Sequence, residues 1–172
     1  MFSGKTTRLI EIYNKYNRSS KKISVINYSM DTRYHDKMLS THNQVMIPCI
    51  FSSTIHSLLD SPVIKDADII LINEGQFFED VYESVVELVE KMKKKVYVCG
   101  LDSDFKRNKF GNLLNLIPLC DNVVKLHSNC NQCDNEAIFS YRITNETSQV
   151  AIGSTNYIPL CRCCYNKMGE ES

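Results

Sequence analysis

The chain lacks a net charge, a long apolar run and a secretory signal. Its 20 basic and 20 acidic residues cancel, so no overall field attracts nucleic acid or an anionic membrane. The longest purely aliphatic run, Ile69–Ile72, is far too short to cross a bilayer. The first residues include Lys5, Arg8 and Glu11 and contain no apolar signal segment. We therefore predict a soluble intracellular protein that binds neither membrane nor nucleic acid.

The opening residues keep only the second half of a phosphate-binding loop. In the full pattern, G-x-x-x-x-G-K-[ST], backbone N–H groups surround phosphates and the lysine reaches the β and γ oxygens. Gly4-Lys5-Thr6 matches the end of this pattern. The apolar residues of Thr7–Tyr16 then recur three and four apart, as in a helix. The sequence therefore predicts a nucleoside triphosphate site.

The first glycine of that loop and the buried strand that normally precedes it are missing. Loss of such a strand would expose backbone groups and apolar surface on its neighbours. Either the sequence starts late, at an internal methionine, or the nucleotide site is weakened. We expect an N-terminal truncation, because the other catalytic motifs are retained.

The first two thirds of the chain alternates between strand and helix patterns. Buried strands are expected at Lys21–Tyr28, Asp68–Asn73 and Lys95–Leu101, a short strand at Val45–Ile50, and helices at Glu79–Lys94 and Leu113–Leu119. This alternation predicts an α/β fold with a mostly parallel sheet and flanking helices, as in P-loop nucleoside triphosphatases. Near Leu126 the pattern ends, so we predict two domains, 1–126 and 127–172.

Two C-x-x-C pairs, Cys130/Cys133 and Cys161/Cys164, are separated by 27 residues. Two such pairs complete a tetrahedral zinc site, and unrelated structural cysteines are the alternative. Cys163 lies inside the second pair, but the spacing favours Cys164 as the ligand. Four protein ligands leave no open position, so we predict a structural zinc ion in a small C-terminal zinc-ribbon domain. The eight cysteines could also form disulfides, but their arrangement suggests metal binding in a reducing compartment, the cytoplasm.

Polar residues follow the apolar strand that ends near position 72. Asn73 occupies the position of the Walker B aspartate that helps to hold Mg²⁺ in P-loop proteins. Its neutral carbonyl oxygen can still orient a magnesium-bound water. Glu74 follows at the carboxyl edge of a parallel sheet, where ligands bind. Glu74 is therefore either a catalytic base or a solvated loop carboxylate.

The basic run Lys91–Lys95 also has two interpretations. It can be a nucleic-acid patch, or it can be a group of cations at a helix C-terminus, where the helix dipole favours positive charge. The zero net charge favours the second interpretation.

Several segments together form a pattern that covers nearly the whole chain. They are MFSGKTT at Met1–Thr7, DTRY at Asp31–Tyr34, Thr41-His42, NEGQFF at Asn73–Phe78, Leu101–Leu119, VVKL at Val123–Leu126 and the two cysteine pairs. This pattern resembles the zinc-containing thymidine kinases found in animals, bacteria and large DNA viruses. The resemblance implies a homotetramer that uses ATP and Mg²⁺ to phosphorylate the 5′-hydroxyl of thymidine.

The resemblance also implies roles for residues at the phosphates. The phosphates would be held by Ser3, Gly4, Lys5 and Thr6, and the Thr6 hydroxyl would also bind Mg²⁺. Beside the phosphates would lie Asp31 and Arg33. Glu74 would take the proton of the 5′-hydroxyl with Gln76 nearby, and Arg107 would add positive charge at the site.

Further residues are implied to bind the nucleoside. Phe105 would stack on thymine, and Phe78 and Phe110 would close the pocket. The space for the methyl group would be lined by Met1, Leu101, Ser140 and Tyr157. The base edge would be bound by a loop that we call the lasso, formed by Gln149, Val150, Ala151, Ile152 and Gly153. Zinc would anchor both ends of this lasso. Considered alone, Phe77 or Phe78 can equally be a core residue.

The chain departs from the family pattern in ways that leave two functions open. Ser103-Asp104 places an extra negative charge near the base pocket, and the lasso is one residue shorter than in familiar members. An active thymidine kinase is favoured by Lys5, Glu74 and Arg107. A non-catalytic, zinc-stabilised nucleoside- or nucleotide-binding protein is favoured by Asn73 and the missing strand. A nucleic-acid-binding zinc ribbon has little support, because few cations lie near the cysteines.

Overall fold

The structure is a computed structural model that describes residues 1–29, 38–40, 45–150 and 156–170. The chain forms two compact units, and each is described by itself. The sheet unit comprises Lys5–Gly100 and Gly111–Cys120, and the cysteine unit comprises Met1–Gly4, Leu101–Phe110 and Asp121–Ser172. The predicted domains, 1–126 and 127–172, divide the chain at a single point and stay a prediction.

A four-stranded parallel sheet with the order β4-β1-β5-β6 forms the centre of the sheet unit. Its strands are β1 (Ile23–Tyr28), β4 (Ile50–Ser52), β5 (Ile69–Ile72) and β6 (Lys95–Val98). Parallel neighbours cannot be joined by tight turns. Helices lie between β5 and β6 in the sequence, whereas the strands of a small hairpin lie between β1 and β4. The predicted α/β class with a parallel sheet is confirmed, and three of the four strands lie where the sequence predicts them.

The sheet unit contains further helices and one small hairpin. They are α1 (Lys5–Asn17), η1 (His56–Leu58), α2 (Pro62–Lys65), η2 (Gly75–Phe77), α3 (Val81–Val86), η3 (Glu87–Lys91), η4 (Leu113–Leu119), β2 (Met38–Ser40) and β3 (Met46–Pro48). η3 is a π-helical continuation of α3, in which the N–H of Met92 bonds to the oxygen of Glu87. Among the described residues, none of these helices combines the length and apolar character that crossing a bilayer requires.

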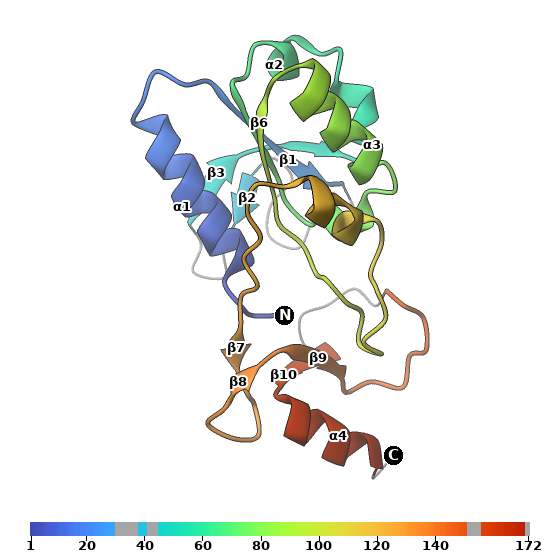
Figure 1. The fold of residues 1–172 in the computed structure, drawn as a ribbon. Coiled ribbons are helices and arrows are strands. Elements are labelled where there is room, and N and C mark those ends of the chain that lie inside the picture. The colour runs from blue at the N-terminus through green and yellow to red at the C-terminus, as the bar shows by residue number, and fades with distance from the viewer. Residues whose placement is uncertain (30–37, 41–44, 151–155, 171–172) are drawn as a thin grey trace. The chain divides into compact units, whose positions relative to one another are not determined.

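Alternate residues of the central strand face opposite helical layers, as strand geometry dictates. Ile70 and Ile72 belong to the apolar cluster that contains α2 and α3, whereas Ile69 and Leu71 belong to the cluster that contains α1. Figure 1 shows α1 and α3 on different sides of the strands of this unit. All four side chains are almost completely buried. β5 is therefore the most enclosed strand, and it leads directly to Asn73 and Glu74.

The cysteine unit is built from two short antiparallel strand pairs and one helix (Figure 1). β7 (Ser128–Asn129) pairs with β8 (Glu136–Ala137), β9 (Phe139–Arg142) pairs with β10 (Tyr157–Leu160), and α4 (Arg162–Glu170) follows. Its buried apolar cluster contains Ala137, Leu160 and two of the cysteines. So small a core supplies little stability, which is why units of this kind use a metal or disulfides.

Candidate functional site

Asn73, just beyond the end of β5, is held from the strands on both sides. Its amide nitrogen donates to Asn27 Oδ1 over 2.8 Å, and its Oδ1 accepts from the Cys99 thiol at 3.0 Å. Only 2% of the residue is exposed. Because carboxyl ends of parallel strands share one edge, this amide ties the ends of β1, β5 and β6 together.

The Cys99 thiol responds to two charges at this edge. Desolvation, and then the Glu74 carboxylate, raise the pKa of Cys99, while the Lys5 ammonium opposes them; the result is a pKa of about 12. Both charged groups therefore lie close enough to act on one buried thiol. The structure thus brings the predicted base and the predicted phosphate-binding lysine to the same edge of the sheet unit.

Glu74 has a left-handed backbone, with φ of 55°. This conformation costs a residue with a side chain on the order of 1–3 kcal/mol and is concentrated at functional sites. The side chain is half-buried, and its Oε2 accepts a 2.6 Å hydrogen bond from Gln76 Nε2. The left-handed backbone ends the extended path of β5, and the hydrogen bond restricts the orientation of the carboxylate.

Two glycines make room for Gln76, which is 3% exposed. A Cβ at Gly111, where φ is 60°, would lie 2.1 Å from the main-chain oxygen of Gln76, and a Cβ at Gly100 would lie 2.5 Å from its Oε1. Side chains at these two positions would displace Gln76 and with it the partner of Glu74. Packing therefore fixes Gln76, the predicted neighbour of the proposed catalytic base Glu74.

The helix α1 begins at Lys5, directly after Gly4. Gly4 has φ of 76°, which glycine adopts without steric cost. The first N–H groups of a helix have no intrahelical acceptor and attract anions, and Lys5 and Thr6 are half-buried beside them. Asp31 and Arg33, which were expected beside the phosphates, lie outside the described residues.

Three of the residues predicted to bind the nucleoside meet around Arg142 in the cysteine unit. The Arg142 guanidinium lies 3.7 Å from the centroid of the Phe105 ring. It donates to the main-chain oxygen of Gln149 at 3.0 Å and to the hydroxyl of Tyr157. Phe105, Gln149 and Tyr157 are thus brought together, and a residue that the sequence did not single out joins them.

The other predicted pocket residues of this unit have different surroundings. The backbone nitrogen of Met1 donates to Ser140 Oγ over 2.6 Å. Phe110 is buried, Ser3 and Leu101 are half-buried, and Val150 is exposed. The lasso residues Ala151, Ile152 and Gly153 lie outside the described residues.

Phe78 and Arg107 have contacts that the resemblance did not suggest. Phe78 is fully buried in the core of the sheet unit and packs edge-to-face on Tyr28, which is the core alternative left open by the sequence. Arg107 donates to Asn166 Oδ1 over 3.1 Å and lies 4.7 Å from the centroid of the Tyr165 ring in the cysteine unit. The pocket role of Phe78 and the catalytic role of Arg107 stay predictions.

The Asp104 carboxylate accepts three hydrogen bonds within the cysteine unit. Its Oδ1 accepts from the backbone N–H groups of Lys106 and Asn108, and its Oδ2 accepts from Gln149 Nε2, each over 2.9 Å. Desolvation raises the pKa of Asp104, but the bonds from Gln149 and the two N–H groups outweigh it, so the pKa is lowered. The extra negative charge therefore closes a turn and holds Gln149.

We expect Asp104→Asn to lower the free energy of unfolding at neutral pH by about 1–3 kcal/mol, because an amide nitrogen cannot accept a hydrogen bond. Folding lowers the pKa of Asp104, so the wild-type advantage is present above the unfolded value of ~3.9 and is lost as pH falls through the lower folded value. Urea denaturation at neutral and acidic pH measures the difference. Asp121→Asn, at an exposed position, is the control, and an equal effect of both variants would contradict the assignment.

The sulfur atoms of Cys130, Cys133, Cys161 and Cys164 all lie within 4.8 Å of one another. Cys133 Sγ lies 3.7 Å from Cys161 Sγ and 3.6 Å from Cys164 Sγ. Thiolates bound tetrahedrally at ~2.3 Å from zinc would be roughly 3.8 Å apart. The spacing therefore fits a zinc ion, and Cys163 lies exposed outside the cluster, in agreement with the predicted ligand set.

Backbone N–H groups also point at the sulfur atoms. The N–H of Cys161 donates to Cys130 Sγ at 3.3 Å, and the N–H of Cys164 donates to Cys161 Sγ at 3.5 Å. Desolvation raises the pKa of the Cys130 thiol, but hydrogen bonds, first among them the one from Cys161, lower it to about 6. Such bonds favour the thiolate that a metal binds.

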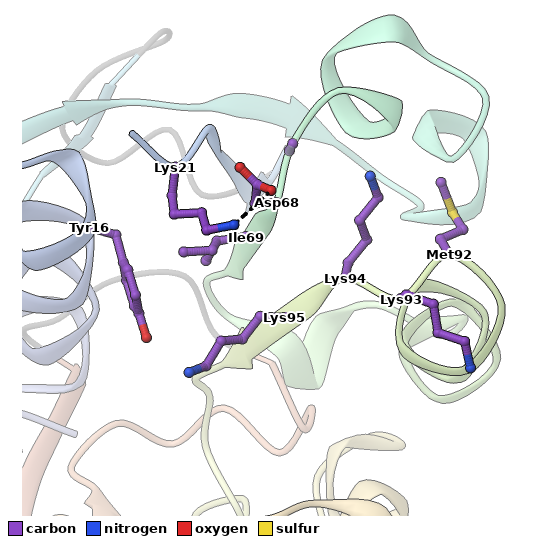
Figure 2. A pocket seen from close by; sticks show the side chains of 9 residues that line it. Tyr16, Lys21, Asp68, Ile69, Met92, Lys93, Lys94 and Lys95 are labelled. Atoms are coloured by element: carbon purple, nitrogen blue, oxygen red, sulfur yellow. Dashed lines mark hydrogen bonds and ion pairs between the residues drawn. The ribbon is translucent and has the colours of Figure 1, made fainter. Parts of the chain in front are cut away.

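A pocket of about 380 Å³ lies at the opposite, amino end of β5 and β6 (Figure 2). It is lined by Tyr16, Lys21, Ala67, Asp68, Ile69, Met92, Lys93, Lys94 and Lys95. Lys21 pairs with Asp68 at 3.3 Å, Lys94 donates to the main-chain oxygen of Lys65, and Lys95 lies 5.5 Å from the Tyr16 ring centroid. Because Asn73 and Cys99 lie at the other ends of these strands, the pocket is separate from the candidate site.

The family model for thymidine kinase matches residues 1–165. The chain belongs to the thymidine kinase family. A relative named thymidine kinase from Sheeppox virus (strain KS-1) is 39% identical over 166 residues, which cover 96% of this chain and 92% of the relative. A thymidine kinase from Vaccinia virus (strain Ankara) is 41% identical over 169 residues, with the same two coverages. The predicted family and the predicted enzyme class, a kinase, are confirmed.

A plant member of the thymidine kinase family is longer than this chain. The thymidine kinase of Oryza sativa subsp. japonica is 36% identical over 170 residues, which cover 96% of this chain. The chain spans 63% of the length of that protein.

The sequence pattern did not single out three residues that contact predicted site residues of this thymidine kinase family member, two in the sheet unit and one in the cysteine unit. Asn27 and Cys99 hold Asn73, and Arg142 holds the aromatic cluster. A signal was present for two of them, because Asn27 is a polar residue inside an apolar strand and Arg142 is a charge at the end of an aromatic strand. Cys99 carries no such signal, because a cysteine in an apolar strand region is typical of an ordinary buried side chain.

Proposed function

We propose that this chain transfers the γ-phosphate of ATP to the 5′-hydroxyl of thymidine and so forms thymidine monophosphate. The observation that supports it most directly is the placement of Lys5 and Glu74 at one edge of the sheet, where both charges act on Cys99. Phosphoryl transfer needs positioning and charge neutralisation more than covalent chemistry. The non-catalytic alternative gains no specific support from the described residues.

On the phosphate side, the first N–H groups of α1 and the Lys5 ammonium bind the β and γ oxygens, and Ser3 and Gly4 help to hold the phosphates. Asp31 and Arg33 are proposed to lie beside them. Thr6 and Asn73 offer only neutral oxygens, so the phosphates of ATP supply most of the negative charge that Mg²⁺ needs. When bound, Mg²⁺ neutralises charge that develops on the transferred group. Asn73 Oδ1 already accepts a hydrogen bond from the Cys99 thiol. Thr6 is therefore proposed to be the stronger Mg²⁺ ligand of the two.

Glu74 takes the proton of the 5′-hydroxyl as that oxygen bonds to the γ-phosphorus and ADP leaves. The hydrogen bond from Gln76 Nε2 restricts the carboxylate to a few orientations. A positioned base of this kind contributes ~10²–10⁴-fold to the rate. Arg107 is proposed to add positive charge for the same step.

The thymine ring is proposed to stack on Phe105 in the cysteine unit. Met1, Leu101, Ser140, Tyr157, Phe78 and Phe110 line the rest of the pocket, and Gln149 to Gly153 bind the base edge. An apolar pocket discriminates one methyl group by only ~1–3 kcal/mol. Backbone groups matched to thymine add rejection of cytosine, whose donors and acceptors would be buried without partners.

The zinc ion is proposed to be structural and to anchor both ends of the lasso. A reducing compartment, the cytoplasm, would keep the four thiols available to it. We also propose that the enzyme is a homotetramer, that it binds no nucleic acid, and that its two domains divide near residue 126.

Thymidine-dependent release of ADP tests the proposed function. The protein is expected to release ADP in the presence of ATP, Mg²⁺ and thymidine, with one thymidine monophosphate formed per ADP. Deoxycytidine in place of thymidine is expected to give little release, because the base edge does not match. Calorimetric binding of thymidine without any ADP release would instead establish the non-catalytic alternative.

A further inference from the structure

Arg142, the last residue of β9, is almost fully buried although it carries a charge that a guanidinium cannot lose. Only 6% of it is exposed. Its Nη1 donates to the main-chain oxygen of Glu146, at 2.8 Å, and to that of Ser148. Its Nη2 donates to the main-chain oxygen of Gln149 and to the Tyr157 hydroxyl. Its fifth donor, Nε, is buried without a partner among the described residues.

All four of these acceptors are neutral. A buried charge with neutral partners loses hydration without the gain of an ion pair, and apolar replacements of buried ionic groups are often equally stable. Stability alone therefore gives a weak reason for an arginine at this position. The arrangement of the acceptors gives a stronger one.

Three of the acceptors are carbonyl groups of one short segment, Glu146 to Gln149, which leads into the predicted lasso. The planar guanidinium presents its donors in a fixed fork, so it can bind several carbonyls only if they follow one path. The side chain of Gln149 also donates to Asp104 over 2.9 Å, which attaches the same segment to the 104–108 turn. Arg142 thus determines the course of the chain at the start of the lasso.

The guanidinium carbon of Arg142 lies over the Phe105 ring, 3.7 Å from its centroid. A contact between a cation and a ring is stronger when it is desolvated than at an exposed site. The main-chain oxygen of Phe105 accepts a hydrogen bond from the Tyr165 hydroxyl, so the residue is held at its ring and at its backbone. Arg142 therefore links Phe105, Tyr157 and the segment 146–149 into one assembly.

We propose that Arg142 is a positioning residue that holds Phe105, Tyr157 and the segment 146–149 in place for the thymine ring. The inference rests on the proposed function, because it assigns Arg142 to the site that would bind thymidine. It acts on nucleoside binding, and the ATP KM is expected to change little, since the phosphate-binding lysine, Lys5, and the start of α1 belong to the sheet unit.

Steady-state kinetics of Arg142→Lys and Arg142→Gln test this role. Lysine keeps the positive charge, but its ammonium group lacks the planar arrangement of donors that binds several carbonyl groups. It also lacks a planar group that could stack on the Phe105 ring. Both variants are expected to raise the thymidine KM about tenfold or more, with kcat and the ATP KM within about threefold of wild type. Arg162→Gln is the matched control, because Arg162 is an exposed arginine that also lies over a ring, 5.0 Å from the Phe139 centroid. This control is expected to leave the thymidine KM unchanged.

Hydrogen exchange of the full-length protein gives a readout that does not depend on activity. In Arg142→Lys the amides of residues 143–150 are expected to exchange about tenfold faster, while those of β1 and β5 exchange at the wild-type rate and the zinc content is unchanged. A merely structural role predicts a lower kcat at constant thymidine KM, from a smaller folded fraction, and would overturn the inference. A lower thymidine KM would also overturn it, because the guanidinium would then be blocking Phe105.

Failure of the proposed function is distinguishable from failure of this inference. If the wild-type protein releases no ADP with thymidine, the proposed function is wrong, and the exchange experiment alone decides the role of Arg142. Wild-type exchange of residues 143–150 in Arg142→Lys would then overturn the inference, and faster exchange confined to them would support it.

Discussion

Glu74→Gln is expected to lower kcat for thymidine phosphorylation about 10²–10⁴-fold, with little change in the KM of thymidine or ATP. Glutamine keeps the length of the side chain and an oxygen that can accept the 2.6 Å hydrogen bond from Gln76. It cannot take the proton of the 5′-hydroxyl. Thymidine-dependent ADP release under saturating substrates measures the loss.

The control for this variant is Glu79→Gln, five residues further along the chain. Glu79 is exposed and also follows β5, so its substitution removes the same charge from nearby without touching the proposed base. Its kcat is expected to stay within about twofold of wild type. Wild-type turnover in Glu74→Gln would show that Glu74 is the solvated loop carboxylate that the sequence alone also allowed.

Loss of a zinc ligand is expected to have an effect of similar size by a different route. Cys130→Ser removes one of four sulfur atoms that lie within 4.8 Å of one another, and a small unit with few other buried residues then loses its main cross-link. Structural zinc contributes on the order of 10 kcal/mol to the folding of small metal-binding domains. We expect the variant to lose bound zinc, the ordered cysteine unit and thymidine-dependent ADP release. Atomic emission and the ADP assay on the same sample measure these losses.

Cys163→Ser provides the matched control, since it removes an exposed cysteine that lies between two ligands in the sequence but outside the cluster. It is expected to keep zinc and activity. Removal of zinc from the wild-type protein with a chelator should reproduce the Cys130→Ser result, and added zinc should reverse it. A zinc-free protein with full activity would show that the cluster has no structural role.

Much of the fold of the sheet unit was predictable from local pattern. The runs of β-branched residues mark β1, β5 and β6, and the three-and-four spacing of apolar residues marks α1. The predicted helix from residue 79 instead begins at Val81. The Asp80 carboxylate just before it accepts from the backbone N–H of His56 at 2.6 Å and from Ser84 Oγ at 3.0 Å. Asp80, just before the helix, is thus bonded to a residue 24 positions earlier, a contact that local pattern does not reveal.

The short strand β4 is a second element that local pattern did not predict correctly. The sequence predicted a strand at Val45–Ile50, whereas the structure has β3 at Met46–Pro48 and a separate strand β4 at Ile50–Ser52. β4 joins the parallel sheet beside β1, and β3 pairs with β2 in a hairpin. Segments of three residues carry too little periodicity to show which partner they will pair with.

The sequence by itself determined which four cysteines to expect in one cluster, the helix that follows Lys5, and the position of Glu74 after an apolar strand. Each of these depends on a local pattern, whether one C-x-x-C pair, one apolar spacing or one strand end, although the two cysteine pairs are separated by 27 residues. Only the tertiary structure decided that Asn73 donates a hydrogen bond to Asn27, 46 residues earlier, and that Arg142 contacts both Phe105 and Tyr157. Those contacts depend on which strands and turns become neighbours, and the burial of whole apolar faces, rather than any local motif, selects those neighbours.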